Sequence, residues 1–264
     1  MNSIVDLSRI PDIQSRPDER RIAIQLVGVN DVRQPMALRM CGHVQPTIAT
    51  WQVAVALPAE RKGTHMSRFV AWLEDMDTPV DDASLVAALD VLLALMDAHE
   101  GRVEAAFPFF LRKVAPVSGV ASRLDYQGRL IAQRKAGATS AWMEVAVPVK
   151  TLCPCSREIS DYGAHNQRSR VTIRARVEAH VEWHELVRFA EDNASSEIWS
   201  LLKRVDEKWV TEHAYENPRF VEDLARDVAL AVGADRRIGA WVVEVENFES
   251  IHNHSAWAHI EGGA

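Results

Sequence analysis

The segment from Arg170 to Val181 alternates strictly between apolar and polar side chains, and this pattern constrains the fold more than any other feature. A period of two is that of a β-strand, and burial on one face only is typical of antiparallel sheets. We therefore expect an antiparallel sheet with one face on the core and the other toward solvent or an interface. The apolar face carries Val171, Ile173, Ala175, Val177 and Ala179, and the polar face carries Thr172, Arg174, Arg176, Glu178 and His180.

The rest of the chain repeats one order of elements. The clearest helix is expected from Asp81 to His99, where Leu85, Leu89, Leu92 and Met96 recur at helical spacing. The order strand, strand, helices, strand, strand occurs about twice, which predicts an α+β fold with antiparallel sheets. The halves meet near residue 137, so we expect two modules, 1–136 and 137–264, with an extended arm over 1–21. Further strands are expected at 22–32, 47–57, 103–117, 122–133, 140–149, 238–248 and 254–262, and further helices at 195–211 and 218–232.

Composition excludes several classes of protein. The net charge of -7 argues against a general nucleic-acid binder, whose footprint would be basic. The first residues contain no apolar stretch typical of a secretory signal, and no apolar run is long enough to span a bilayer. Three cysteines argue against a disulfide framework, and Cys41 is expected to be an inert thiol. We expect a cytoplasmic protein.

The stretch LCPCSREISDYGAHNQRSR, residues 152–170, carries the strongest chemical signal. It places Cys153, Cys155 and His165 in a short polar span, and these side chains suit borderline-soft metals or nucleophilic catalysis. A structural zinc site needs four such ligands, whereas a catalytic site needs three and an open position for water. The alternative is a surface loop with inert thiols.

Three more groups of residues are candidates. Glu207 is expected to point away from the apolar stripe of its helix, Ile198, Leu202, Val205 and Trp209, and Glu222 lies near the edge of the apolar face of the next helix; either carboxylate could simply be solvated. Glu249, His252 and His254 lie in one connection, where they could transfer protons near neutral pH or form a polar hairpin loop.

The loop RKGTHMSR follows an expected strand and is rich in donors. Gly63 permits close backbone approach, and cationic and hydroxyl groups suit phosphate oxygens. The alternative is an ordinary basic turn. The candidate anion-binding residues are Lys62, His65, Ser67 and Arg68.

Together these segments resemble one family, the metal-dependent GTP cyclohydrolases of type IB. The resemblance rests on IPDIQSRPDERR near the start, KGTHMSR at 62–68, CPCSREISDYGAHNQRS at 153–169, the region EIWSLLKRVDEKWVTEHAYENPRFVEDLARD and NFESIHNHSA at 247–256. It spans nearly the whole chain, and the block from 153 to 169 is highly specific.

The resemblance implies two tandem tunnelling-fold modules, each an antiparallel sheet with helices on one face. Such modules associate through their sheets into barrels, so a homo-oligomer, expected to be a tetramer, would place sites between subunits or modules. It also implies that Cys153, His165 and Glu207 hold one divalent metal, which could be zinc, manganese or ferrous iron. Cys155 would lie beside the metal as a second thiol.

The resemblance implies a reaction as well. Glu222 would anchor guanine through its N–H edge, while Lys62, His65, Ser67 and Arg68 would approach the triphosphate. Water activated by the metal would attack C8 of GTP. Proton transfer by His252 and Glu249 would then open the imidazole ring, release formate and lead to 7,8-dihydroneopterin triphosphate, the first step of tetrahydrofolate synthesis.

Two other functions fit parts of the pattern. A related tunnelling-fold enzyme could reduce a nitrile with a nicotinamide cofactor, which predicts activity without metal and a thioimide adduct on Cys155 or Cys153. A non-enzymatic scaffold stabilised by zinc predicts a closed site with four ligands and loss of folding on chelation.

Overall fold

The framework of the protein is one eight-stranded sheet in which every neighbouring pair of strands is antiparallel and the strand order follows the chain. This computed structural model describes residues 12–40 and 42–263, so Cys41 and the first part of the expected arm lie outside the described residues. The strands are β1 Ile24–Met40, β2 His43–Leu57, β3 Gly101–Val114, β4 Ala121–Lys135, β5 Ala138–Leu152, β6 Asn166–Val177, β7 Ile238–Asn247 and β8 Ala256–Gly262. Every expected strand is present, with adjusted ends.

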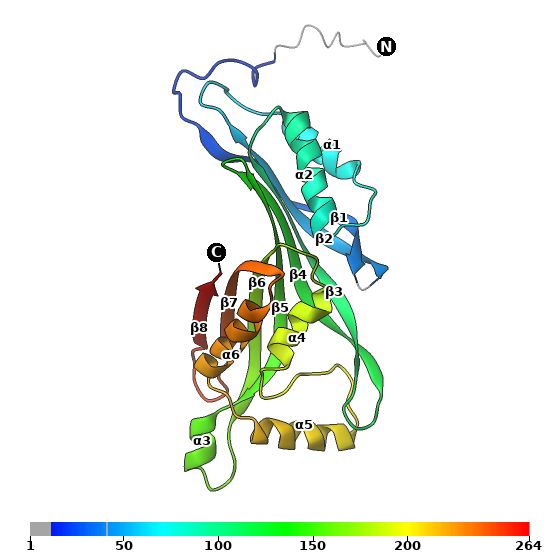
Figure 1. Cartoon of the computed structure of the whole chain (residues 1–264), viewed down its shortest axis with the longest axis vertical. Helices are drawn as coiled ribbons and strands as arrows, with labels where there is room; N and C mark the ends of the chain where they lie inside the picture. The colour runs from blue at the N-terminus through cyan, green and yellow to red at the C-terminus, as the bar shows by residue number, and fades with distance from the viewer. Residues whose placement is uncertain (1–11, 41, 264) are drawn as a thin grey trace, which may run out of the picture.

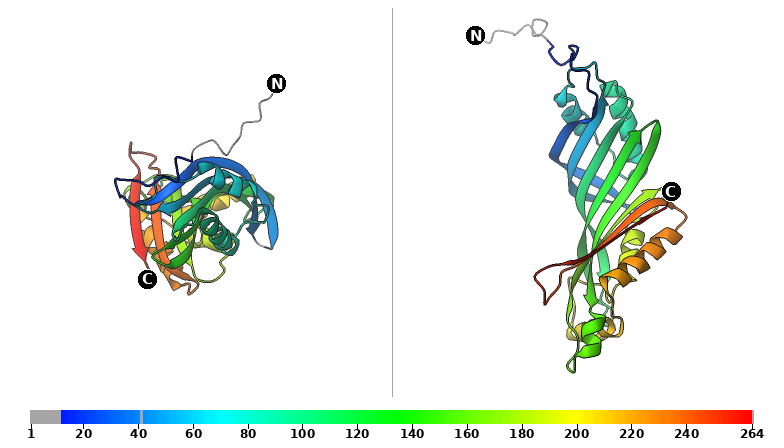
Figure 2. Two further views of the ribbon diagram at one scale, coloured as in Figure 1. Left: turned by 90° about the horizontal axis from the view of Figure 1, so that it is seen from above. Right: turned by 90° about the vertical axis from the view of Figure 1, so that its left-hand side faces the viewer.

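Helices cover one face of this long, twisted sheet (Figure 1). Helix α2 packs on β3, β4 and β5, and helix α6 packs on β7 and β8. The sheet lies to one side of the helices when the molecule is turned (Figure 2). The helices are α1 Met66–Glu74, α2 Asp82–Met96, α3 Pro154–Ile159, α4 Trp183–Glu191, α5 Arg204–Glu216 and α6 Val221–Ala234. Within the described residues, none has the length and apolar character needed to cross a membrane.

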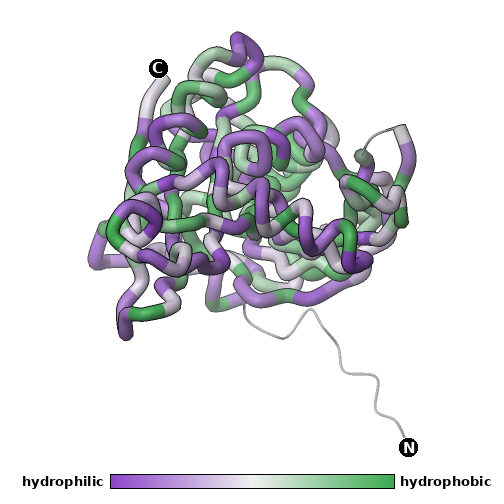
Figure 3. The backbone as a smooth tube through the Cα atoms, turned by 90° about the horizontal axis from the view of Figure 1, so that it is seen from below, coloured by the Kyte–Doolittle hydropathy of each residue, from purple (hydrophilic) through white to green (hydrophobic). Residues whose placement is uncertain are grey.

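The register of the strands follows from alternating burial. On β3, Val103, Ala105, Phe107 and Phe109 are buried beneath the helices, while the residues between them are more exposed. Hydrophilic and hydrophobic residues alternate along much of the chain (Figure 3). A shift of one residue would expose the whole apolar set, so this pattern fixes the pairing.

One hydrophobic core joins the two halves of the chain. The ring of Trp183 on α4 lies 5.5 Å from the ring of Phe107 and 5.0 Å from that of Phe109, both on β3. Aromatic pairs at these centroid distances add stabilisation beyond the area that they bury. Helix α4 of the second half therefore packs directly on a strand of the first half.

The expected turn near residue 137 is present, and it is a tight hairpin rather than a linker. Ala136 and Gly137 both have positive φ, 50° and 77°, as a two-residue hairpin turn of type I′ requires. Lys135 and Ala138 pair on either side, and β4 and β5 stay paired beyond them. One sheet thus runs through the expected boundary, and the division into modules 1–136 and 137–264 stays a prediction.

Among the expected helices, the one at Asp81–His99 is confirmed as α2. Its N-cap is Asp81, whose carboxylate accepts a hydrogen bond from Ser84 N at 2.7 Å, while Ser84 Oγ accepts from Asp81 N. This reciprocal pair is a capping box. The helix expected at 218–232 is confirmed as α6, which begins three residues later than expected, at Val221.

The expectation for residues 195–211 was wrong in its start and in its buried face. Residues 195–203 are not helical, and within them the backbone of Ser196 forms an isolated bridge with Lys150 on β5. The buried side chains of α5 are Asp206, Val210 and Ala214, whereas Val205 is 53% exposed. The buried face of α5 therefore includes an aspartate and differs from the expected apolar stripe. Hydrophobic periodicity could not predict that an aspartate would be buried there. Helices α1, α3 and α4 were not expected from the sequence.

Candidate active site

Cys153 and His165 are brought together by strand pairing. They follow β5 and precede β6, and these two strands pair up to Leu152 and Asn166. Cys153 N donates to the carbonyl oxygen of His165 at 3.1 Å. Ser156 Oγ donates to the carbonyl oxygen of Cys153 and accepts from His165 N, both at 3.1 Å. The thiol caps α3 by accepting from Ser156 N at 3.4 Å. The short loop is therefore fixed at both of its ends.

A buried chain of polar side chains orients the imidazole of His165. Gln167 Nε2 donates to Thr151 Oγ1 at 2.8 Å, so Gln167 Oε1 is free to accept from His165 Nδ1 at 3.1 Å. Thr151 continues to Ser169 at 2.7 Å, and Ser169 Oγ donates to Asn247 Oδ1 at 2.8 Å. A proton on Nδ1 leaves the Nε2 lone pair of His165 available, as in metal-binding histidines held by an outer partner.

Cys153, His165, Gln167 and Asn247 line a cavity of about 270 Å³ where β5, β6, β7 and the start of α6 meet. Glu249 extends toward His165, with 3.9 Å between Glu249 Oε2 and His165 Nδ1. The rings of His252 and His254 stack at 5.1 Å in the connection after β7. The lining residues are Cys153, His165, Gln167, Arg219, Phe220, Val221, Glu222, Asn247, Glu249, His252, His254 and Ala256.

Glu222 enters this cavity from the first turn of α6. Helix starts favour negative charge, because their free N–H groups carry partial positive charge. Arg219 fixes the approach to the helix, since its backbone N donates to the carbonyl oxygen of Leu152 at 3.0 Å. Its guanidinium Nε donates to the carbonyl oxygen of Asn193 at 3.3 Å. The residue just before Cys153 and the residues just before Glu222 are thereby held together.

Cys155 and Glu207 do not line this cavity. Cys155 is exposed on α3. Glu207 is exposed on α5, as expected, but it lies at the far end of that helix. The end nearest the Cys153 loop is marked by Tyr215, whose ring lies 4.7 Å from the guanidinium carbon of Arg157. Eight residues separate Glu207 from Tyr215, about 12 Å along a helix axis.

The four candidate phosphate ligands, Lys62, His65, Ser67 and Arg68, lie at the opposite end of the molecule. They surround the start of α1, in the upper part of Figure 1, whereas α3, which begins next to the cavity-lining Cys153, lies toward the bottom. His65 Nε2 lies 3.4 Å from a carboxylate oxygen of Asp12. Lys62, Ser67 and Arg68 are exposed. Within one chain these residues therefore stay apart from the cavity.

The donor set in the cavity suits a divalent metal in part. A thiol and an imidazole with an available Nε2 are good ligands for borderline-soft metals. Within residues 12–40 and 42–263, however, no three His, Cys, Asp or Glu side chains gather closely enough to hold a metal. The residues present supply two of the three expected ligands, and Glu207 would have to come from elsewhere.

Gln167, Arg219 and Asn247 are parts of the cavity that the sequence did not single out. Two residues of the buried polar chain, Gln167 and Ser169, could have been found from the alternation along β6. The inward-facing positions Val171 and Ile173, continued toward the start of the strand, predict that Ser169 and Gln167 point inward as well. A polar side chain at a position that periodicity assigns to the core requires a buried partner. Arg219 had no such signal, because its role depends on where the chain turns in space.

Thus an α+β fold with an antiparallel sheet places a thiol, imidazoles and carboxylates in one polar cavity. These are side chains that hydrolytic enzymes use. The model of the family described as "Type I GTP cyclohydrolase folE2" matches residues 10–258. The chain belongs to this family, which confirms the resemblance noted from the motifs.

Relatives from several organisms match over nearly the whole chain. A protein named GTP cyclohydrolase FolE2 from Methylibium petroleiphilum is 59% identical, over 96% of this chain and 95% of its own length. One of the same name from Paraburkholderia xenovorans is 56% identical, over 99% and 98%. Among solved structures, uricase from Arthrobacter globiformis is similar in fold, with a TM-score of 0.53 at 10% identity over 91% of this chain and 93% of that one.

Proposed function

We propose that this protein opens the imidazole ring of GTP, releases formate and forms 7,8-dihydroneopterin triphosphate, as expected for its family. The observation that carries the proposal is the cavity in which Cys153, His165, Glu222, Glu249 and His252 all meet. Five of the residues chosen from the sequence, separated by up to 99 positions, converge on one site. Relatives at 56–59% identity carry the name of this activity.

Cys153 and His165 are the proposed metal ligands within one chain, and Glu207 of a second copy is the proposed third. Within its own chain Glu207 lies at the end of α5 away from the Cys153 loop. A bound zinc, manganese or ferrous ion would supply a hydroxide near neutral pH by lowering the pKa of water. Because Cys155 is exposed outside the cavity, its proposed place beside the metal also depends on the assembled protein.

Glu222 is the proposed guanine anchor. Its carboxylate lies in the first turn of α6 and can accept from N1–H and from the 2-amino group of guanine at the same time. Guanine held there would lie over the cavity that contains His165 and Glu249. Orientation of the base toward the water-activating side chains is itself a source of rate enhancement.

Glu249 and His252 are the proposed proton-transfer pair. Glu249 is nearly buried, with 12% of its side chain exposed, and lies 3.9 Å from His165. His252 lies in the exposed connection that follows and lines the same cavity. A carboxylate at the wall and an imidazole at the rim can move protons between the reacting ring and solvent.

The assembled protein is proposed to be a cytoplasmic homo-oligomer, with a tetramer as the expected form. Lys62, His65, Ser67 and Arg68 can approach a triphosphate at the cavity only from another copy, since they lie at the other end of their own chain. The polar face of the sheet is left uncovered by helices and is the proposed surface for association into barrels.

The proposed tandem modules are supported by a repeated arrangement. Each half runs strand, strand, helices, strand, strand. His43 and Gln45 open β2 with the same His-x-Gln spacing that His165 and Gln167 have at the start of β6. Gln45 holds the end of β3, because its Nε2 donates to the carbonyl oxygen of Phe110 at 3.1 Å.

Two variants test the reaction. We expect Glu249→Gln and His252→Ala to slow formate release from GTP by at least about 100-fold, the usual range for a lost general acid or base. Metal content and oligomeric state should stay unchanged. Glu246→Gln is the matched control, because Glu246 lies only three positions before Glu249, near the end of β7, but is paired with Arg170. Turnover unchanged in both variants would contradict the assigned roles.

A further inference from the structure

We propose that Asp206 is a positioning residue, which sets the place and orientation of Glu207 for metal binding. The inference rests on the proposed function, in which Glu207 is a ligand. Asp206 is completely buried, at 0% exposure, although it is an aspartate in the first turn of a surface helix. A buried carboxylate is stable only when its oxygens accept hydrogen bonds, so the donors around Asp206 show which segments it holds in place.

Asp206 binds two separate elements at once. One carboxylate oxygen accepts from Val117 N at 2.9 Å and from Ser118 N at 2.8 Å. The other accepts from Ser118 Oγ at 2.6 Å and from Lys203 N at 2.8 Å. Burial alone would raise the pKa of Asp206, but the bonds from Ser118, Lys203 and Val117 hold that pKa well below its usual range.

These bonds do more than cap the helix. The bond from Lys203 N alone would cap α5, because it pairs the free backbone N–H of the N-cap residue. Asp223 does the same for Phe220 N at the start of α6. The three additional bonds go to Val117 and Ser118 in the turn between β3 and β4, nearly ninety positions earlier. They fix the start of α5 on a hairpin of the first half of the chain.

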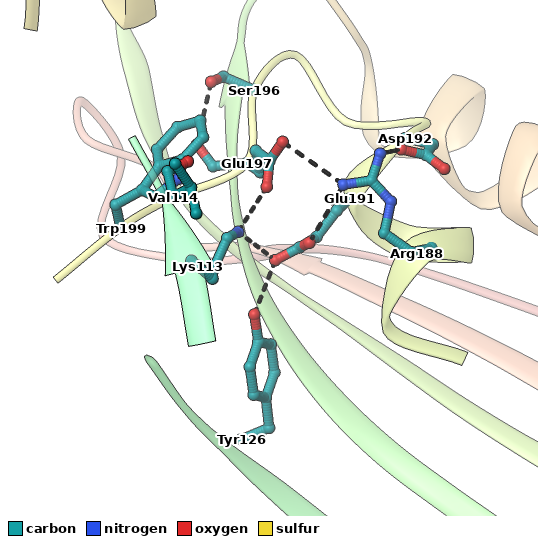
Figure 4. Close-up of polar contacts among 9 residues, drawn as sticks. All are labelled: Lys113, Val114, Tyr126, Arg188, Glu191, Asp192, Ser196, Glu197 and Trp199. Carbon is teal, nitrogen blue, oxygen red and sulfur yellow. Dashed lines mark hydrogen bonds and ion pairs between the residues drawn. The ribbon is translucent and has the colours of Figure 1, made fainter. Parts of the chain in front are cut away.

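The segment leading into α5 is anchored on the same hairpin. Trp199 Nε1 donates to the carbonyl oxygen of Val114 at 3.0 Å, and Ser200 Oγ donates to that of Arg123 at 2.7 Å. Lys113 Nζ lies 2.6 Å from Glu197 Oε2 and 2.5 Å from Glu191 Oε1 (Figure 4). The hairpin end is therefore a platform that determines where α5 begins.

Glu207 follows directly and has the opposite environment. Its side chain is exposed and has no hydrogen bond or ion pair with any residue that the structure describes. Neighbouring residues on a helix point about 100° apart, so fixing Asp206 toward the hairpin fixes the direction of Glu207. A carboxylate held in direction but left unpaired suits a ligand that is offered to another surface.

The test is a double-mutant cycle read by cobalt affinity. Co²⁺ is titrated into metal-free protein, and the absorbance of the thiolate–cobalt bond at Cys153 reports binding without any turnover. We expect Asp206→Asn to weaken Co²⁺ binding by at least about tenfold, as for other groups that orient ligands. If Asp206 acts through Glu207, the variant Asp206→Asn/Glu207→Gln should bind no more weakly than Glu207→Gln alone.

Controls separate positioning from general destabilisation. Asp81→Ala removes the side-chain cap of α2, away from the cavity, and should leave Co²⁺ affinity unchanged at a comparable loss of thermal stability. Ser118→Ala removes only one of the bonds to Asp206 and should weaken Co²⁺ binding in the same direction, by less. If Asp206→Asn does not fold, the Co²⁺ affinity of Ser118→Ala is measured in its place.

The outcomes are distinct. Weakened binding in Asp206→Asn with no further loss in the double variant supports the inference. Unchanged affinity in Asp206→Asn, or losses that add in the double variant, would overturn it while Glu207 remains a ligand. Unchanged affinity in Glu207→Gln would instead remove Glu207 from the metal site, and the positioning role would fall with that part of the proposed function.

Discussion

At the scale of single residues, the two carboxylates of the cavity differ in ways that suit different tasks. Glu249 is nearly buried and lies beside His165, with 3.9 Å between its Oε2 and the imidazole Nδ1. Glu222 is exposed in the first turn of α6 and lines the same cavity. A carboxylate at an exposed position on a cavity wall is placed to recognise N–H donors on an incoming base.

This difference predicts the behaviour of Glu222→Gln toward two nucleotides. Inosine triphosphate lacks the 2-amino group of guanine, so it leaves part of the Glu222 carboxylate unpaired. The native protein should therefore prefer GTP in kcat/KM by at least about tenfold, as for a lost hydrogen bond to a charged group. Glu222→Gln should lose most of that preference, measured by formate release from each nucleotide. A preference that survives the substitution would place the guanine elsewhere.

At the scale of elements, the end of the β3–β4 hairpin and the helix α4 are joined by a buried group of charges. Lys113 and Glu191 are 8% and 3% exposed in their side chains, and Tyr126 OH donates to Glu191 Oε1 at 2.8 Å. Burial raises the pKa of Glu191, and Lys113 opposes that rise. Arg188 lies 3.8 Å from Glu191 and completes the charge balance (Figure 4).

Lys113→Met should destabilise the protein strongly, because it leaves carboxylates buried without their cation. Removing one partner of a buried ion pair costs about 3–5 kcal/mol of the free energy of unfolding. The combined variant Lys113→Met/Glu191→Leu should recover part of that loss. Urea denaturation of the native and variant proteins measures both effects, and a loss below 1 kcal/mol in the single variant would show that the pair contributes no more than a surface pair.

How far the sequence predicts these elements depends on what holds them. The strands were found because their alternation is local, and α2 was found because its leucines and its cap lie within one segment. Helix α5 was misplaced, since its start depends on Asp206 reaching a distant hairpin. Cys153, His165 and Glu249 were chosen from motifs, but the partner Asn247 becomes visible only when β6 and β7 are paired.

At the scale of the whole molecule, the proposed site residues are divided between the two ends of a single chain. The cavity with Cys153 and His165 lies at one end of the sheet, and Lys62 and Arg68 lie at the other. Glu207 lies on the hairpin side of α5, away from the Cys153 loop. A site built from the three proposed metal ligands and the proposed phosphate-binding residues would therefore require more than one copy of the chain.

A shared site predicts complementation between inactive variants. Cys153→Ala and Glu207→Gln should each abolish formate release as pure oligomers. If each site takes Cys153 from one copy and Glu207 from another, subunits mixed by dissociation and reassembly should regain part of the native activity, because some sites then contain neither substitution. Mixing Cys153→Ala with His165→Ala is the control, since both residues come from the same chain. No recovery in the first mixture would place all three ligands in one chain.

The central claim is that the cavity opens the GTP ring with the help of a bound divalent metal. The most direct measurement is GTP turnover by chelator-treated protein, with zinc, manganese or ferrous iron added back singly. Formate and the fluorescence of the oxidised pterin product are followed together. The account predicts that the metal-free protein stays folded and inactive, and that at least one metal restores both signals. Full turnover of GTP by the metal-free protein, or folded protein that no metal activates, would contradict it.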